Sequence, residues 1–293
     1  MPRIAVFGGT GYLASLIKYQ NNVKINKYVF FSREKKSKNY IDYSSLKKNY
    51  LKFKKFDFAI HILGPNNNQL KKNKYFIQNK NQITSNICDV CLKNNIKLIY
   101  ISSLQVYKNY GKKNIYLNSI INKENKYSHL HYQSEEIIKS KFLNHSNMFT
   151  ILRVGNVFGF RKNIKLRELK NNLIHSLCDT ALKKRKILIN NCSIQRTFIP
   201  SKIYIQTINL IIKKKIINNS IMNIIYKNLT LKNIADIIKS RIRFVLNFNI
   251  DTELKNFTKK KIFVIYSNKK LKFKYKKRTF IFEIDQILKN LKN

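Results

Sequence analysis

Residues 3–14 read RIAVFGGTGYLA, an apolar run followed by three glycines and the start of an amphipathic segment. The run RIAVF predicts a buried strand, and YLASLIKYQ after the glycines predicts a helix. A glycine turn between strand and helix lets the backbone approach a pyrophosphate closely, and the helix N-terminus offers unpaired N–H donors. Ala14 is small enough for helix and strand to pack closely. The stretch predicts a dinucleotide site formed by Gly8, Gly9, Thr10, Gly11, Tyr12 and Leu13.

Strand-like and helix-like segments alternate through the first half of the chain. Four more apolar runs predict strands: KYVFFSR (27–33), FDFAIHILG (56–64), IKLIYISS (96–103) and FTILRVGNVFG (149–159). Helical periodicity marks residues 81–95 and 127–141 between them. We therefore expect an α/β fold, with a doubly wound parallel-sheet Rossmann domain over residues 1–155. A smaller mixed C-terminal substrate domain is expected over residues 156–293, with parts of it returning to the Rossmann sheet.

The pattern loosens after Phe160, where a basic helical stretch runs toward Leu182. Residues 186–191 and 195–199 predict short strands, and residues 201–212 and 229–242 predict amphipathic helices. The last segment, FIFEIDQILKNLKN (280–293), predicts a strand that passes into a final helix.

The charge balance is strongly basic, with 59 Lys and Arg against 14 Asp and Glu and a formal net charge of +45. Such a charge admits a nucleic-acid-binding protein as a remote alternative. The lysines are spread along the whole chain, however, and Asn and Ile are enriched beside them, which indicates a codon bias instead. We expect no nucleic-acid partner. A salt series of binding to random DNA separates the two readings.

Neither a membrane span nor a metal site is expected. No run of about 18 or more apolar residues occurs, and the N-terminus enters a strand directly without a secretory signal, so we expect a cytoplasmic protein. Cys88 and Cys91 form a CxxC, but no second pair follows at zinc-finger spacing, and both fit the apolar face of a helix. The histidines show no metal-ligand spacing.

The end of the second predicted strand bears on cofactor choice. An acidic residue there would bond the ribose 2′-hydroxyl of NAD. This chain has Ser32 and Arg33 instead, and an arginine can pair with a 2′-phosphate. The cofactor is expected to be NADP or NAD, with NADP favoured.

The chain resembles the extended short-chain dehydrogenase/reductase family, whose members include NAD-dependent nucleotide-sugar epimerases, dehydratases and reductases. The resemblance lies in the order of GGTGYLA, AIHILG, ISSLQVY, a helix that begins with tyrosine, and LRVGNVFG. It continues in QRTFIP, LTLKNIADII and SNKKLKF, and so covers essentially the whole chain.

This resemblance implies roles for particular residues. Tyr127 matches the catalytic tyrosine, and Ser103 matches the serine or threonine that bonds the reacting sugar oxygen. Leu63 and Gly64 would border the nicotinamide half of the cofactor. The nucleotide diphosphate of a nucleotide-sugar substrate would be held by Asn156, Asn172, Leu173 and Arg196. Relatives also lead us to expect a homodimer built around the tyrosine helix.

Two departures from the family pattern decide the expected reaction. The lysine that lowers the pKa of the tyrosine in the family stands four residues after it, and here that position holds His131. Imidazole can still bond the nicotinamide ribose but is charged only in part near neutral pH. The acidic pair that dehydratases carry after the serine is replaced by Leu104 and Gln105.

We therefore expect an NAD(P)-dependent nucleotide-sugar epimerase or 4-keto reductase, with Tyr127 as acid/base and His131 at the lysine position. The alternative is a catalytically silent Rossmann protein that binds NADP as a sensor. A third departure from the family pattern follows Arg196, where this chain has Thr197 and relatives have Asp. This substitution bears on the geometry of the loop that contains Arg196.

Overall fold

The computed structural model describes residues 1–20, 26–33, 39–43, 46–64, 70, 74–160, 172–256 and 276–292. The chain forms two compact units. The first contains residues 1–108, 119–154 and 207–223, and the second contains residues 109–118, 155–206 and 224–293. The chain thus leaves and re-enters each unit, and the expected division after residue 155 stays an expectation. The predicted segment SNKKLKF and residues 161–171 of the basic stretch lie outside the described residues.

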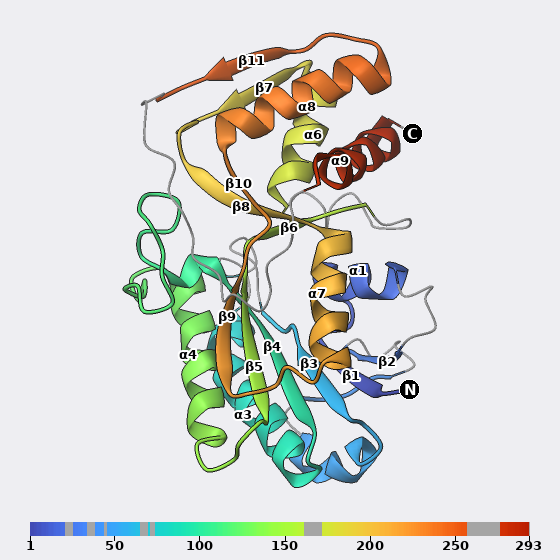
Figure 1. Cartoon of the computed structure of the whole chain (residues 1–293), viewed down its shortest axis with the longest axis vertical. Coiled ribbons are helices and arrows are strands. Elements are labelled where there is room, and N and C mark those ends of the chain that lie inside the picture. Colours follow the sequence, from blue (N-terminus) through green and yellow to red (C-terminus); the bar gives the residue numbers. More distant parts are fainter. Residues whose placement is uncertain are drawn as a thin grey trace. The chain divides into compact units, whose positions relative to one another are not determined.

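The first unit is built on a six-stranded sheet (Figure 1). Its strands are β1 (Arg3–Phe7), β2 (Lys27–Phe31), β3 (Phe58–His61), β4 (Lys97–Ser103), β5 (Phe149–Val154) and β9 (Ser220–Ile224). Their order is β2-β1-β3-β4-β5-β9, and the pairs β2–β1, β1–β3, β3–β4 and β4–β5 are parallel. Both β3 and β5 are buried along their whole length, because helices cover both faces of such a sheet.

Helices alternate with these strands, which confirms the predicted Rossmann-like α/β fold. They are α1 (Tyr12–Gln20), α3 (Lys74–Lys93) and α4 (Lys126–Lys141), with 3₁₀ turns η1 (Leu46–Phe53) and η2 (Leu104–Val106). Figure 1 shows α4 on one side of the sheet and α1 on the other. The helices α3 and α4 pack against each other.

One predicted strand is divided in the structure. FTILRVGNVFG forms β5 and then, after Gly155, a separate strand β6 (Asn156–Phe158) that belongs to the second unit. The edge beside β5 is completed by β9, which returns to the sheet from much later in the chain. Tyr107, just after η2, donates a hydrogen bond to Asn223 of β9 (2.9 Å) and so secures this strand.

The apolar core of the first unit lies between the sheet and its helices. Cys88 and Cys91 of α3 are fully buried in it, which confirms that this CxxC serves core packing. Burial raises the pKa of both thiols well above their usual range.

The described residues of the second unit form two small sheets and three helices. Strands β6, β8 (Gln195–Pro200) and β10 (Lys227–Thr230) form a mixed sheet in the order β10-β8-β6. Strands β7 (Lys186–Ile189) and β11 (Asp251–Leu254) form a parallel pair. The helices are α6 (Leu173–Lys184), α8 (Leu231–Leu246) and α9 (Lys277–Lys292), and α7 (Ser201–Lys213) carries the chain from this unit back to the first.

The predicted strand at FIFEI is wrong, because these residues are helical and belong to α9. Aromatic and β-branched side chains favoured the strand prediction. The buried positions nevertheless recur at helical spacing and pack against α6 and α8. They are Phe280, Glu283, Ile284, Ile287 and Leu288.

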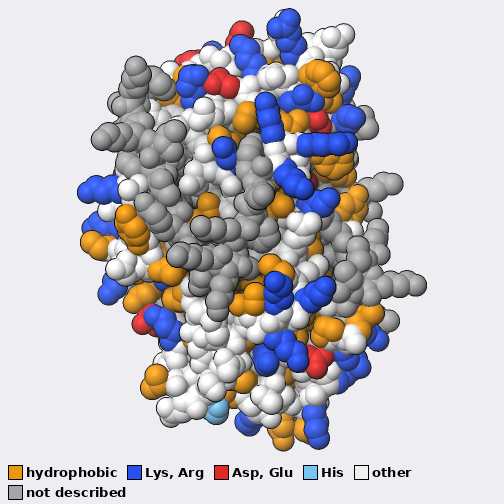
Figure 2. Space-filling model, viewed as in Figure 1, with side chains coloured by type: hydrophobic (Ala, Val, Ile, Leu, Met, Phe, Trp, Pro, Cys, Tyr) orange, Lys and Arg blue, Asp and Glu red, His pale blue; other side chains and the backbone are white. Residues whose placement is uncertain are grey.

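Lys and Arg side chains are scattered over the visible, non-grey surface in Figure 2, with few acidic side chains among them. Within the described residues, no helix combines the length and apolar character needed to cross a bilayer.

Candidate active site

The glycine turn connects β1 to α1 and lies tightly against the end of β2. Gly8 has a φ of +98°, a conformation that glycine adopts without strain. The backbone N–H groups of Gly8 and Gly9 both donate to the Phe31 carbonyl, at 3.3 and 2.8 Å. A Cβ on Gly9 would lie 2.7 Å from the Cβ of Phe30, so any side chain there would collide with β2. The sequence therefore needs glycine at both positions to form this turn.

The turn fits a dinucleotide pyrophosphate. Among the described residues, a Cβ on Gly11 would meet a single neighbouring atom within 4 Å, the Gly8 carbonyl oxygen at 3.3 Å, so they leave the backbone otherwise open at this point. The helix α1 starts directly after it at Tyr12. The first N–H groups of a helix lack intrahelical partners and carry partial positive charge, which suits an anion.

The other predicted cofactor residues lie at the same edge of the sheet. The order of strands reverses beside β1, and in open parallel sheets ligands bind outside the carboxyl ends of the strands at this point. Leu63 and Gly64 follow β3, the neighbour of β1, and a Cβ on Gly8 would lie 3.2 Å from the Leu63 nitrogen. Ser32 and Arg33 follow β2, the neighbour on the other side.

The hydroxyl pair predicted from the family pattern is positioned by η2 and α4. Ser103 ends β4, and its Oγ caps η2 by accepting a hydrogen bond from the Gln105 N–H (3.1 Å). Tyr127 lies in the first turn of α4, and the next residue, Ser128, donates from its Oγ to the Gln105 carbonyl (2.6 Å). Both residues therefore neighbour the same contact between η2 and α4.

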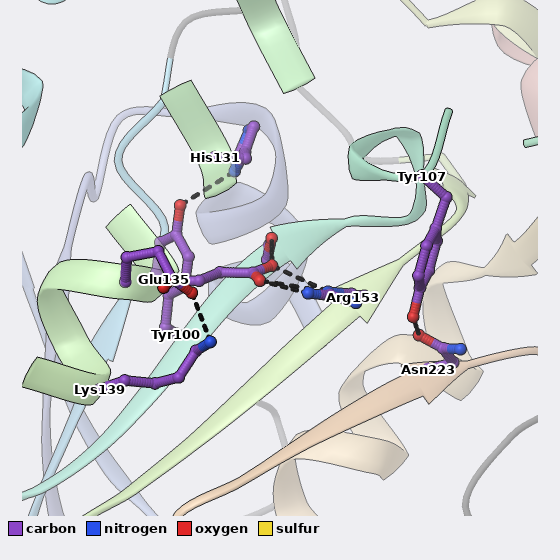
Figure 3. Close-up of polar contacts among 9 residues, drawn as sticks. Tyr100, Tyr107, His131, Glu135, Lys139, Arg153 and Asn223 are labelled. Atoms are coloured by element: carbon purple, nitrogen blue, oxygen red, sulfur yellow. Dashed lines mark hydrogen bonds and ion pairs between the residues drawn. The ribbon is translucent and has the colours of Figure 1, made fainter. Parts of the chain in front are cut away.

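His131 lies one helical turn after Tyr127, with ring centroids 4.6 Å apart. Its Nδ1 bonds the Tyr100 hydroxyl (2.9 Å), as Figure 3 shows. A Cβ on Gly64 would lie 3.5 Å from its Nε2, so the imidazole borders the segment predicted to meet nicotinamide. Burial lowers the pKa of His131 well below its usual range, and the neighbouring Lys80 lowers it further, so the imidazole is neutral near pH 7.

Three buried polar residues near His131 were missed by sequence reasoning. Lys80 of α3 is only 2% exposed and bonds the Tyr100 hydroxyl and the Leu130 carbonyl, both at 3.3 Å. Glu135 of α4 forms a buried ion pair with Arg153 of β5 (2.6 Å) (Figure 3). Helical spacing was the available signal for Lys80, because it precedes Thr84 and Ile87 on the buried face of α3.

The residues predicted to hold the nucleotide diphosphate all belong to the second unit. Asn156 begins β6 and donates to the Thr197 carbonyl of β8 (3.3 Å). Asn172 caps α6 directly before Leu173, and its Nδ2 donates to the Val157 carbonyl (2.6 Å).

Arg196 lies on β8, where it pairs with Leu229 of β10. It donates to the Tyr110 carbonyl (3.2 Å), and its guanidinium lies over the Tyr110 ring. The asparagine amides and this guanidinium therefore also stabilise the local backbone.

Metal-ligating side chains are not gathered anywhere in the described part of the chain: no group of three or more His, Cys, Asp or Glu could hold an ion. His61 and His175 are buried and bond Thr84 Oγ1 and the Gly159 carbonyl. Burial lowers the pKa of His61 to about 3 and that of His175 to about 4. Both histidines are thus neutral packing residues.

The model of the NAD dependent epimerase/dehydratase family matches residues 4–224, and the chain belongs to this family. The family comprises extended short-chain dehydrogenases/reductases, in agreement with the resemblance drawn from the motifs. No curated protein matches the sequence.

Solved structures with the same fold can be aligned with this chain over essentially its whole length. The UDP-Glc/GlcNAc 4-epimerase from Campylobacter jejuni has a TM-score of 0.77 at 17% identity, over 100% of this chain and 99% of its own. The UDP-glucose 4-epimerase from Bifidobacterium longum, solved with NAD+ and UDP, has a TM-score of 0.76 at 16% identity, over 99% and 98%. RMD from Pseudomonas aeruginosa, solved with NADPH, has a TM-score of 0.75 at 12% identity, over 99% of both chains. At these identities the likeness establishes the fold.

Proposed function

We propose that the chain is an NAD(P)-dependent nucleotide-sugar epimerase or 4-keto reductase. The observation that carries this proposal is the convergence of four features at one edge of the sheet: the glycine turn, the segment Leu63–Gly64, His131 and Tyr127. The glycine turn reaches Leu63, Gly64 borders His131, and His131 contacts Tyr127. Family membership and the nucleotide-sugar enzymes among the structural neighbours support the substrate class.

The chain's own residues would move the proton of the reaction. A nicotinamide held at this edge of the sheet would supply the hydride acceptor or donor for the sugar carbon. In the oxidative direction the Tyr127 phenolate takes the proton of the sugar hydroxyl, and in the reductive direction the Tyr127 phenol donates a proton to the keto oxygen. Ser103 would bond the same sugar oxygen and hold it beside Tyr127.

The direction of the reaction depends on charge near Tyr127. An ordinary phenol has a pKa near 10, so it acts as a base at neutral pH only beside a positive charge. The neutral His131 ring does not supply that charge. Donation from the neutral phenol needs no positive charge, so His131 alone suffices for reduction, whereas oxidation needs a cation other than His131.

Elimination of water from the sugar is not part of the proposal. Leu104 and Gln105 follow Ser103 and form η2, and neither side chain can act as acid or base. The reaction is therefore restricted to hydride and proton transfer at one carbon.

For the substrate, we propose that the nucleotide diphosphate meets Asn156, Asn172, Leu173 and Arg196. Arg196 has N–H groups beyond the one that bonds the Tyr110 carbonyl, and a guanidinium fork matches phosphate oxygens. Thr197, the departure from the family's acid, donates to Asn228 (2.6 Å) and is fully buried, so it stabilises the β8–β10 pair.

For the cofactor, NADP is proposed ahead of NAD. The support is Arg33, which with Ser32 directly follows β2, where an acid would bond a 2′-hydroxyl. Among the structural neighbours, the Bifidobacterium longum enzyme was solved with NAD+ and RMD with NADPH.

The test is incubation of the purified chain with a panel of nucleotide sugars and 4-keto sugars and each of the four nicotinamide cofactors. Nicotinamide absorbance reports reduction, and proton NMR of the sugar reports inversion at the carbon. Tyr127→Phe is the control, since it keeps the ring and removes the hydroxyl. We expect turnover that this substitution abolishes; turnover that persists in Tyr127→Phe would exclude Tyr127 as acid/base.

The second candidate, a silent cofactor-binding protein, is favoured by His131 at the lysine position. It predicts that reduced cofactor binds, with a rise in nicotinamide fluorescence, while no nucleotide sugar in the panel is converted. Binding with conversion rejects it.

A further inference from the structure

Lys80 is a buried lysine whose printed hydrogen bonds go to neutral groups. It donates to a phenol and to a carbonyl, and in the described residues it forms no ion pair. Glu135, the acid whose charge acts on Lys80, is bound by Arg153 Nε and Nη2 (3.0 and 2.6 Å) and by Ser102 Oγ (2.5 Å). Burial of an unpaired charge is costly, so its retention points to a role beyond packing.

The contacts of Lys80 set the direction of a hydrogen-bond chain. In its protonated form, below about pH 7, Lys80 only donates, so the Tyr100 oxygen accepts from it. The Tyr100 hydrogen is then free to donate to His131 Nδ1 at 2.9 Å, the contact drawn in Figure 3. Because Nδ1 accepts, the hydrogen of the neutral imidazole lies on Nε2. Nε2 is the ring nitrogen beside Gly64.

The position of Lys80 is fixed by its own helix. His61 Nδ1 accepts from the Leu63 N–H (3.3 Å), so its Nε2 carries hydrogen toward Thr84 Oγ1 (3.1 Å). Thr84 Oγ1 in turn donates to the Lys80 carbonyl (2.9 Å). These hydrogen bonds thus hold the turn of helix α3 that carries Lys80 beside the end of β3.

We propose that Lys80 is the positioning residue that takes over from the lysine which relatives carry four residues after the tyrosine. It acts through Tyr100 on His131 and brings its positive charge into the surroundings of Tyr127, and the inference rests on the proposed function. His131 would then offer an Nε2–H donor to a bound nicotinamide ribose, and Lys80 in its protonated form would supply the charge that a neutral imidazole lacks. The two functions of the family lysine are to bond the nicotinamide ribose and to lower the pKa of the tyrosine. In this chain they would be divided between His131 and Lys80.

The first test reads the His131 tautomer in the cofactor-free protein by ¹⁵N NMR of labelled imidazoles. His131→Gln assigns the resonance. We expect the Nε2–H form in the wild type, and a shift toward Nδ1–H in Lys80→Met and in Tyr100→Phe. Lys139→Met, which removes an exposed lysine from α4, is the matched control and should leave the resonance unchanged. An Nδ1–H form in the wild type, or no change in Lys80→Met, overturns the inference.

The second test is rescue. Lys80→Met is expected to lower kcat by roughly a hundredfold, the lower end of what acid–base catalysis contributes, and to weaken cofactor affinity, because His131 loses its Nε2–H donor. The double variant Lys80→Met/His131→Lys restores a lysine at the family position and is expected to recover at least roughly tenfold. Thermal unfolding of each variant confirms that it is folded. A Lys80→Met enzyme as active as the wild type, or a folded double variant without recovery, overturns the inference.

The proposed function and the inference about Lys80 can be refuted separately. If the wild type converts no substrate, the proposed function fails while the NMR result still decides the hydrogen-bond chain. If the wild type is active and Lys80→Met changes neither kcat nor the His131 resonance, the inference about Lys80 fails alone.

Discussion

Replacing Lys80 by Met removes a buried cation whose cost to the fold depends on pH. Burial lowers the pKa of Lys80 from its ordinary 10.5 to about 7, although Glu135 nearby raises it in part. The side chain is 2% exposed. Methionine has a similar length, is apolar, and does not titrate, so the variant isolates the contribution of the charge.

The sign follows from proton binding. Between pH 7 and 10.5 the unfolded chain keeps a proton on this lysine that the folded chain has released, so the wild type becomes more stable as pH rises. The penalty of burying Lys80 is about 4 kcal/mol at pH 7 and declines by about 1.4 kcal/mol per pH unit. It vanishes above pH 10.5 and is greatest below pH 7.

The assay is urea-induced unfolding of wild type and Lys80→Met at a series of pH values across this window. The stability advantage of the variant should shrink with rising pH at the slope given above. Lys139→Met is the control and is expected to change stability by about 0.5 kcal/mol or less, because surface ion pairs contribute little. A difference between wild type and Lys80→Met that is constant across the window would refute the reasoning.

Three further substitutions test the fold and the cofactor site. Gly9→Ala places a Cβ against Phe30, and we expect the affinity for reduced cofactor, measured by fluorescence titration, to fall at least about tenfold; unchanged affinity contradicts the tight turn. Glu135→Gln breaks the buried pair with Arg153 and should cost about 3–5 kcal/mol in urea unfolding, whereas a loss below about 1 kcal/mol would show that the charges are hydrated. Arg33→Glu should weaken NADPH binding about tenfold or more and spare NADH; equal effects on both would exclude a 2′-phosphate contact.

Much of the first unit could be predicted from the sequence because its signals are local. The glycine turn, the buried strand runs and the helix that begins near Tyr127 each depend on neighbouring residues. The position of β9 could not be predicted, since a strand that returns from residue 220 to pair beside β5 is fixed by non-local packing. The end of the chain failed for a different reason: FIFEI has strand-like composition, and only its packing against α6 and α8 makes it helical.

The candidate site, too, was predictable where its signals are local in the sequence and not where they depend on non-local packing. The family pattern identified Tyr127, Ser103 and the substitution at His131, since these are matters of residue type and spacing. Lys80 was hidden because one buried lysine cannot be distinguished by composition in a chain with 59 Lys and Arg. Only the structure brings α3 and α4 together so that Lys80 and His131 bond the same Tyr100 hydroxyl.

The central claim is that the turn at residues 8–11 holds a dinucleotide whose nicotinamide end lies beside Tyr127. A crystal structure of the chain with oxidised cofactor tests it most directly. The account predicts the pyrophosphate on the turn, a ribose hydroxyl bonded to His131 Nε2, and the nicotinamide ring next to the Tyr127 hydroxyl. A nicotinamide bound away from Tyr127, or a turn covered by the protein's own side chains, would contradict it.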